Sequence, residues 1–232
     1  MYKFKNLYKK DALRIWIDLS TLCNAKCPQC HRTNPDGLGK VDWLPLKQWT
    51  LEDFKRKFDL RTLKHITMFN ICGTWGDPIM CREFLEICQY IMDHSTAEIE
   101  VNTNGSTRPE EWWFELVRIC RKRLTIVFAI DGSTQEIHHL YRVGTNLKRI
   151  LANMDVVSLG SRSKVYTVVF KHNQHDLDNI RDLAAEHGAE TIYFVPSSRM
   201  EDGEPTFYTH KNVKFKLEPP IDFEMRRELK LK

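Results

Sequence analysis

The chain has 232 residues, of which 35 are Lys or Arg and 31 are Asp or Glu, so its formal net charge is only +4. A balance this close gives no indication of a nucleic-acid partner, and no run of about 18 apolar residues predicts a membrane span. The first residues lack the apolar stretch of a secretory leader. The chain has seven cysteines, and an odd number favours a reducing compartment over a set of disulfides. We therefore expect a globular protein of the cytoplasm, with no membrane or nucleic-acid partner.

Segments with strand and helix patterns alternate along the chain. Short β-rich runs predict strands at residues 14–19, 65–72, 98–102, 124–130, 165–170 and 191–195. Apolar residues at helical spacing predict helices at residues 51–58, 82–94, 109–121, 146–158 and 176–187. Thr50, with Asp53 three positions on, is typical of a helix start, and Gly188 is typical of a helix end.

This alternation predicts an α/β fold with parallel strands, because each strand–helix–strand unit returns the chain in the same direction. Six strands are too few to close an eight-stranded barrel, so we expect an open, partial (β/α)6 barrel over residues 1–200. Residues 201–232 are expected to form a C-terminal extension that packs on the same domain. Within it, the sequence predicts a loop at 201–205, a further strand at 213–217, and a solvated basic tail that includes Arg226, Arg227, Lys230 and Lys232.

The run Cys-Asn-Ala-Lys-Cys-Pro-Gln-Cys, after the first predicted strand, brings three cysteines together at Cys23, Cys27 and Cys30. An iron–sulfur cluster normally has four cysteine ligands, so a cluster held by three keeps one iron open to an outside ligand. An open position distinguishes a catalytic metal site from a closed structural one. Two other interpretations stay open on these residues: a zinc site with His31 as fourth ligand, and three ordinary core cysteines.

Other polar motifs also follow predicted strands. Because ligands in parallel α/β folds bind beyond the carboxyl ends of the strands, we expect these loops to meet at one site. In chain order they are Gly73-Thr74-Trp75-Gly76-Asp77-Pro78, Thr103-Asn104-Gly105, Asp131-Gly132, Lys171-His172-Asn173 and Pro196-Ser197-Ser198.

With its motifs in this order, the chain resembles the radical S-adenosylmethionine (radical SAM) superfamily over about residues 11–200, and it is most similar to the SPASM-type, peptide-modifying branch. The resemblance implies a [4Fe–4S] cluster on Cys23, Cys27 and Cys30, with SAM bound to the open iron. It also implies an external one-electron donor, similar to flavodoxin or ferredoxin. SAM would then be cleaved to a 5′-deoxyadenosyl radical that abstracts hydrogen from a substrate.

The same resemblance assigns residues to the methionine part of SAM. The loop Trp75-Gly76-Asp77-Pro78 stands where the family has Gly-Gly-Glu-Pro. Gly76, Asp77 and Pro78 are therefore expected near the methionyl ammonium, which a glycine backbone can approach closely. Arg142 resembles an arginine that pairs with the methionine carboxylate in peptide-modifying relatives, as the geometry of a guanidinium permits.

Further residues are assigned to the rest of SAM. Asn102 and Asn104 resemble polar residues near the methionine or ribose. Asp131 matches an aspartate at the end of the fourth strand, and it is the candidate catalytic residue, in contact with ribose or substrate. The backbone around Val169 is expected to border the adenine, and Val195 to cover the face of that ring.

Three departures from the family pattern follow from the sequence. Ala129 replaces a serine that relatives use on the cofactor, and Gln29 stands where many radical enzymes have an aromatic residue. The chain has no cysteine after Cys120. Auxiliary clusters need thiolates, so the C-terminal part of this chain cannot build them.

We therefore expect a radical SAM enzyme with a single cluster, acting on a peptide, an amino acid or a small metabolite. Two alternatives belong to other classes. One is a radical enzyme that modifies a nucleobase. The other is a non-catalytic module that binds zinc or an iron–sulfur cluster.

Overall fold

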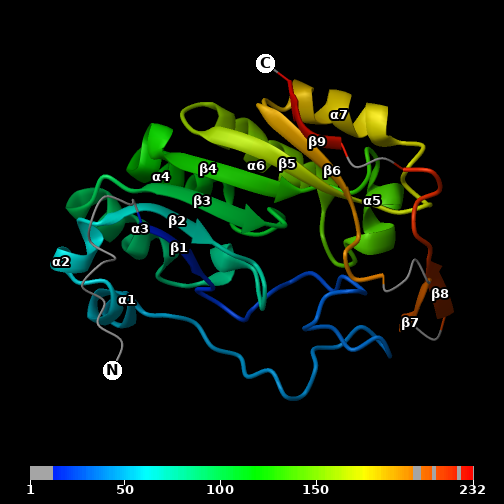
Figure 1. Ribbon diagram of the computed structural model, residues 1–232, viewed down its shortest axis with the longest axis horizontal. Helices are drawn as coiled ribbons and strands as arrows, with labels where there is room; N and C mark the ends of the chain where they lie inside the picture. The colour runs from blue at the N-terminus through cyan, green and yellow to red at the C-terminus, as the bar shows by residue number, and fades with distance from the viewer. Residues whose placement is uncertain (1–12, 201–204, 211–212, 224–225, 232) are drawn as a thin grey trace.

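Six parallel strands and one antiparallel edge strand form the main sheet in the computed structural model of the chain (Figure 1). The structure describes residues 13–200, 205–210, 213–223 and 226–231. Neighbouring parallel strands in the sheet follow one another in the sequence, as expected for right-handed βαβ units. The parallel strands are β1 (Leu13–Ile17), β2 (Ile66–Ile71), β3 (Glu98–Thr103), β4 (Leu124–Ala129), β5 (Arg162–Val169) and β6 (Thr191–Pro196). This order confirms the predicted α/β fold with a partial (β/α)6 barrel.

Helices connect these strands at the predicted places, with two additions. The helices are α1 (Leu51–Lys57), α2 (Leu60–Leu63), α3 (Phe84–His94), α4 (Glu110–Cys120), α5 (Gln135–Tyr141), α6 (Leu147–Ser158) and α7 (Leu177–Glu186), with short 3₁₀ turns at Pro78–Met80 and Arg121–Arg123. The additions are α2 and α5, which are too short to show a helical period in the sequence. In the described ranges, no helix is long and apolar enough to cross a bilayer.

The residues predicted to begin and end helices make the expected capping contacts. The Thr50 hydroxyl accepts the Asp53 N–H (3.1 Å), and the Asp53 carboxylate accepts the Thr50 N–H (3.2 Å), which makes a capping box for α1. Gly188 follows the end of α7 with a φ of +80°, a conformation that glycine adopts without strain.

The two faces of the sheet differ in character. Alternate side chains of the strands pack with the helices into one apolar core, in which Phe69, Val101, Phe128 and Trp113 are fully buried. The opposite, concave face carries mainly polar side chains that line two cavities. They include Glu98, Glu100, Asn102, Thr125, Arg162, Lys164 and Tyr166, and the Asn70 side chain is hydrogen-bonded to Glu100 and Asn102.

Hydrogen bonds and ion pairs connect these polar side chains across the concave face. The Asn102 amide donates to Asn70 (3.0 Å), which in turn donates to Glu100 (3.0 Å). Glu100 pairs with Lys164 at 3.1 Å. A complete eight-stranded barrel would fill its interior with apolar side chains, so this polar face indicates an open, hydrated interior.

The C-terminal residues depart from the sequence prediction in two ways. The strand predicted at 213–217 exists as β8 (Val213–Leu217), but it pairs with β7 (Thr206–His210) in a separate antiparallel hairpin. The expected basic tail is wrong, because Arg226–Lys230 form β9, which pairs antiparallel with β6 at the edge of the main sheet (Figure 1). Covering an edge in this way protects its backbone groups from pairing with other chains. Residues 201–204 and Lys232 lie outside the described residues, and the division at residue 200 stays a prediction.

The strand β9 should stabilise the sheet through its apolar contacts. Leu229 packs against the main core, whereas the neighbouring Lys230 is exposed. We expect Leu229→Ala to lower the free energy of unfolding by about 1–2 kcal/mol, because the side chain is partly buried. The matched control Lys230→Ala should change it by less than about 0.5 kcal/mol. Urea denaturation of both variants measures these values, and equal effects would contradict a packed β9.

Candidate active site

The three cysteines of the motif line one cavity of about 210 Å³ at the carboxyl ends of the strands. The loop after β1 carries them, and the walls are completed by the ends of β2 and β3 with their loops, by β4 and β5, and by the residue that follows α5. Its lining residues are Cys23, Ala25, Cys27, Cys30, Arg32, Gly73, Gly76, Asp77, Asn102, Thr103, Asn104, Val127, Ala129, Arg142 and Tyr166. The cavity thus unites the three predicted metal ligands with Gly76, Asp77, Asn102, Asn104 and Arg142.

The glycine loop after β2 lies directly on the backbone that leads into Cys23. A Cβ atom at Gly76 would overlap the carbonyl oxygen of Ser20 and would stand 2.7 Å from that of Leu22. The next residue strengthens the contact, since the Asp77 N–H donates to the Leu22 carbonyl at 2.7 Å. Glycine is therefore required at position 76 for two loops to meet at the cavity.

Asp77 joins the same loop to the end of β3. One carboxylate oxygen accepts the Thr103 hydroxyl at 2.7 Å, and the other accepts the Asn104 N–H at 2.8 Å. Burial raises the pKa of the Asp77 carboxyl, while these donors favour the ionised form. Asp77 therefore acts as a brace between two loops, with both oxygens already in hydrogen bonds.

Asp18 holds the other end of the glycine loop, a role that sequence analysis missed. Its carboxylate accepts the N–H groups of Thr74 (2.8 Å) and Trp75 (3.3 Å). Asp18 is the first residue after β1, so the rule that polar residues at strand ends belong to the site could have identified it. The loops after β1 and β2 are thus connected by backbone contacts at Leu22 and by this carboxylate.

Polar groups surround the cysteines. The Asn104 amide lies 3.7 Å from the Cys23 sulfur and also donates to the Asn24 side chain at 2.9 Å. Burial raises the pKa of both the Cys23 and the Cys27 thiol. A metal centre reverses this effect, because bound thiols are deprotonated.

Arg142 reaches the cavity from the end of α5. Its Nε–H donates to the buried Asp131 carboxylate, and its Nη1 lies 3.8 Å from the Cys27 sulfur. The negative charge of Asp131 outweighs the effect of burial and raises the pKa of Arg142, so the guanidinium stays charged. Burial raises the pKa of Asp131, and the charge of Arg142 opposes this shift.

His138 fixes the position of both members of this ion pair. Its Nδ1 accepts the Asp131 N–H at 3.2 Å, and its Nε2 lies 2.9 Å from the Thr145 hydroxyl. That hydroxyl donates to the Arg142 carbonyl at 2.7 Å, so it accepts a hydrogen bond from the Nε2–H. The ring is therefore neutral, and burial lowers its pKa to about 3.

Four of the predicted site residues do not line the cavity. Asp131 stands behind Arg142, and its second oxygen accepts the Val168 N–H at 2.6 Å. Pro78 is buried at the start of a 3₁₀ turn, and Val169 belongs to the apolar core. Val195 is half-buried on β6, paired with β5.

The zinc alternative lacks its fourth ligand. His31 is exposed, lies 6.2 Å from the Trp75 ring and does not line the cavity. Across the described part of the chain, no three Cys, His, Asp or Glu side chains converge on a point that one metal ion could occupy. The three cysteines instead lie around the wall of the cavity, an arrangement that suits a cluster of several irons better than one tetrahedral ion.

Gln29 connects the cysteine loop to the C-terminal residues. Its Nε2 donates to the Thr206 hydroxyl (2.9 Å), and its Oε1 accepts the Ser197 hydroxyl (2.5 Å). The hairpin β7–β8 also exchanges backbone hydrogen bonds with the loop, since Thr209 accepts from Gly37 and donates to Pro35, both at 2.9 Å. Gln29 stands at a position that is aromatic in many radical enzymes. In this chain its side chain helps to hold the β7–β8 hairpin against the cysteine loop.

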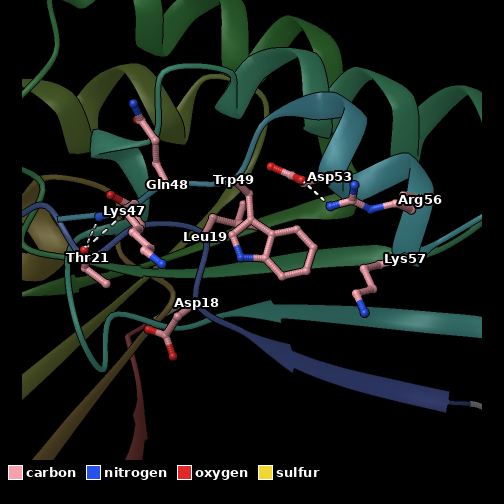
Figure 2. Close-up of a pocket in the computed structure, with 10 residues that line it drawn as sticks. Asp18, Leu19, Thr21, Lys47, Gln48, Trp49, Asp53, Arg56 and Lys57 are labelled. Atoms are coloured by element: carbon pink, nitrogen blue, oxygen red, sulfur yellow. Dashed lines mark hydrogen bonds and ion pairs between the residues drawn. The ribbon is translucent and has the colours of Figure 1, made fainter. Parts of the chain in front are cut away.

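A third cavity, of about 300 Å³, lies between α1 and residues 18–21 (Figure 2). Trp49 and Leu19 form its apolar wall, and Arg56 at its rim pairs with Asp53 at 2.6 Å. It contains no cysteine and no residue of the glycine loop. Its walls brace the start of the cysteine loop, because Leu19 and Thr21 share backbone hydrogen bonds with residues 47–49.

The neutral state of His138 predicts how stability depends on pH. Between pH 6.5 and about 3 the unfolded chain binds a proton at His138 that the folded protein does not. Stability should therefore fall as the pH drops below 6.5, by up to about 1.4 kcal/mol per pH unit from this group. We expect His138→Gln to reduce that slope in urea denaturation between pH 7.5 and 5.5. An unchanged slope would contradict the assignment.

The Gln29 contacts predict how firmly the hairpin is held. Gln29→Leu keeps the size of the side chain and removes two hydrogen bonds, which should cost about 1–3 kcal/mol of stability. Faster hydrogen exchange at the Gly37 and Thr209 amides should accompany this loss. Thr206→Val removes one partner and should give roughly half the effect; a wild-type exchange rate in Gln29→Leu would refute the anchoring role.

Comparison with known proteins agrees with this geometry. Residues 17–184 match the model of the Radical SAM superfamily. The chain is 23% identical over 199 residues to a probable GTP 3′,8-cyclase of Sulfurisphaera tokodaii, a match that covers 85% of this chain and 60% of the relative. It is 25% identical over 175 residues to the mycofactocin maturase MftC of Mycobacterium ulcerans, covering 74% and 44%. The chain thus spans about half the length of these relatives.

Solved structures share the fold. The crystal structure of Streptococcus suis SuiB bound to the precursor peptide SuiA aligns with a TM-score of 0.65 at 15% identity, over 82% of this chain and 40% of SuiB. The structure of anSMEcpe with bound AdoMet aligns with a TM-score of 0.62 at 16% identity, over 80% of this chain and 51% of that protein. Because the family model covers more than two thirds of the sequence, the chain belongs to the Radical SAM superfamily, whose enzymes use a [4Fe–4S] cluster and SAM.

Proposed function

We propose that the chain holds one [4Fe–4S] cluster on Cys23, Cys27 and Cys30 and binds SAM beside it. The observation that carries this proposal is the shared cavity, in which the three thiols face the glycine loop, Asn104 and Arg142. When bound, the reduced cluster supplies the electron that cleaves SAM to a 5′-deoxyadenosyl radical. The electron comes from an external one-electron donor of the flavodoxin or ferredoxin type.

The chain's own residues hold SAM in this proposal. The backbone of Gly73 and Gly76 receives the methionyl ammonium, since both oxygens of Asp77 already accept hydrogen bonds. Arg142 receives the methionine carboxylate with the part of its guanidinium that Asp131 leaves available. Pro78 and Asp131 act indirectly, the first by shaping the glycine loop and the second by orienting Arg142.

The remaining assignments concern the nucleoside. Asn102 lies at the floor of the cavity and would contact the ribose or methionine, together with Asn104. The backbone near Val169 would border the adenine, because the side chain itself is committed to the core. Val195 would cover the face of the ring from β6.

The concave face supports a polar substrate. Its charged and amide side chains are hydrogen-bonded to one another, and Tyr166 at the cavity is 40% exposed. We propose a peptide, an amino acid or a small polar metabolite, from which the radical abstracts hydrogen. The structure of SuiB bound to its precursor peptide, which shares the fold of this chain, supports this class.

A nucleotide substrate is the second candidate. Tyr166 and Tyr193 stack at 6.3 Å on the concave face, and aromatic rings of this kind can stack on a base. The similarity to a probable GTP 3′,8-cyclase points the same way. Consumption of added GTP by the reduced, SAM-loaded protein would favour this candidate, and intact GTP would favour the first.

The proposed cluster predicts a specific loss in Cys27→Ala. Anaerobic reconstitution of the wild type should give about four irons and four sulfides per chain, with broad absorption near ~400 nm. Dithionite and SAM should then yield 5′-deoxyadenosine, measured by liquid chromatography and mass spectrometry. Cys27→Ala should lose both the cluster and cleavage, because a thiolate ligand is removed.

The matched control is Cys72→Ala, since Cys72 is a half-buried thiol that does not line the cavity. It should keep its iron content. A wild-type protein with four irons that never cleaves SAM would overturn the enzymatic proposal. Retained cleavage in Cys27→Ala would overturn the ligand assignment, and a colourless protein that takes up zinc would favour the non-catalytic alternative.

A further inference from the structure

Arg32 is a buried cation beside the cysteines, and its charge has no partner among the residues that the structure describes. It follows Cys30 by two positions, lines the cysteine cavity and is only 7% exposed. Its Nη2 donates to the Thr21 carbonyl at 3.1 Å. Its Nε is buried without a hydrogen-bond partner among the residues that the structure describes.

An arrangement of this kind is costly unless a ligand completes it. A buried donor left unsatisfied costs about 1–3 kcal/mol, and a buried charge costs more unless an opposite charge accompanies it. Arg32 takes part in none of the ion pairs in the described ranges. A negatively charged group with a hydrogen-bond acceptor is therefore the expected missing partner.

Arg142, the other cation of the cavity, is in a different situation. Its charge is already neutralised by the buried carboxylate of Asp131, and its Nη1 lies 3.8 Å from the Cys27 sulfur. Asn104, which lies 3.7 Å from the Cys23 sulfur, is a neutral donor. Arg32 is thus the group that can compensate additional negative charge at the three cysteines.

We propose that Arg32 donates its Nε–H to a sulfur of the bound cluster, either a cysteine or a sulfide, and thereby raises the reduction potential of the cluster. This inference rests on the proposed function, because it requires a cluster on the three cysteines. Reduction adds one electron from the external donor and so one negative charge, and no proton is transferred. A fixed positive charge and an N–H···S bond stabilise the reduced state more than the oxidised one.

The test measures the reduction potential of the reconstituted cluster without SAM, in a titration with dithionite followed by electron paramagnetic resonance. Arg32→Gln removes the charge but can still donate to Thr21, and we expect its potential to shift to more negative values. Arg32→Lys keeps the charge and should shift less. The matched control Arg56→Gln removes an arginine of the third cavity, beside α1, and should keep the wild-type potential.

A second measurement does not require a variant that loses the positive charge at position 32. In wild-type protein labelled with ¹⁵N-arginine, the reduced cluster should show a ¹⁵N coupling in pulsed electron paramagnetic resonance, and Arg32→Lys should lose most of it. Arg142 Nη1, which lies 3.8 Å from the Cys27 sulfur, should give the weaker coupling that remains in Arg32→Lys. A coupling of wild-type strength in Arg32→Lys, or an unchanged potential in Arg32→Gln with four irons bound, would overturn the inference. If the wild type itself binds no four-iron cluster, the proposed function fails instead.

Discussion

The cavity depends above all on the close contact between the glycine loop after β2 and the chain that enters Cys23. Gly76 has no space for a side chain against the Ser20 and Leu22 carbonyls, and the Asp77 N–H bonds to Leu22. The Asp77 carboxylate then extends the connection to the end of β3. Two adjacent residues, Gly76 and Asp77, therefore position the loops that follow three consecutive strands. These contacts also set where the cysteines lie relative to the residues proposed to bind SAM.

The C-terminal residues complete this arrangement from the other side. The hairpin β7–β8 bonds to the loop after Cys30, and Gln29 connects the same loop to Ser197 and Thr206. Tyr208 and Leu217 of the hairpin pack in one apolar cluster with Ala25 and Cys27. A short hairpin thus covers the cysteine loop in a chain that has no cysteines for auxiliary clusters after Cys120.

Much of the fold and of the site was predictable because the signals are local. Strand and helix periods located six strands and five helices, and Thr50 and Gly188 marked helix ends correctly. The rule that ligands bind at strand ends brought most of the candidate residues to one cavity. The helices α2 and α5 were missed because they are too short to show a period. The pairing of β9 with β6 and the role of Asp18 were missed because each depends on contacts between distant segments.

The sequence by itself determined the chemistry that is available: three thiols at close spacing, glycines after a strand, and cations nearby, because residue type and spacing along a strand–loop unit are local properties. Only the tertiary structure decided how each group is used. Asp77 became a brace, Arg142 was paired with Asp131, and Arg32 was left buried with an unpartnered Nε. The physical reason is that burial and the choice of hydrogen-bond partner are set by segments far apart in the chain, which no local pattern records.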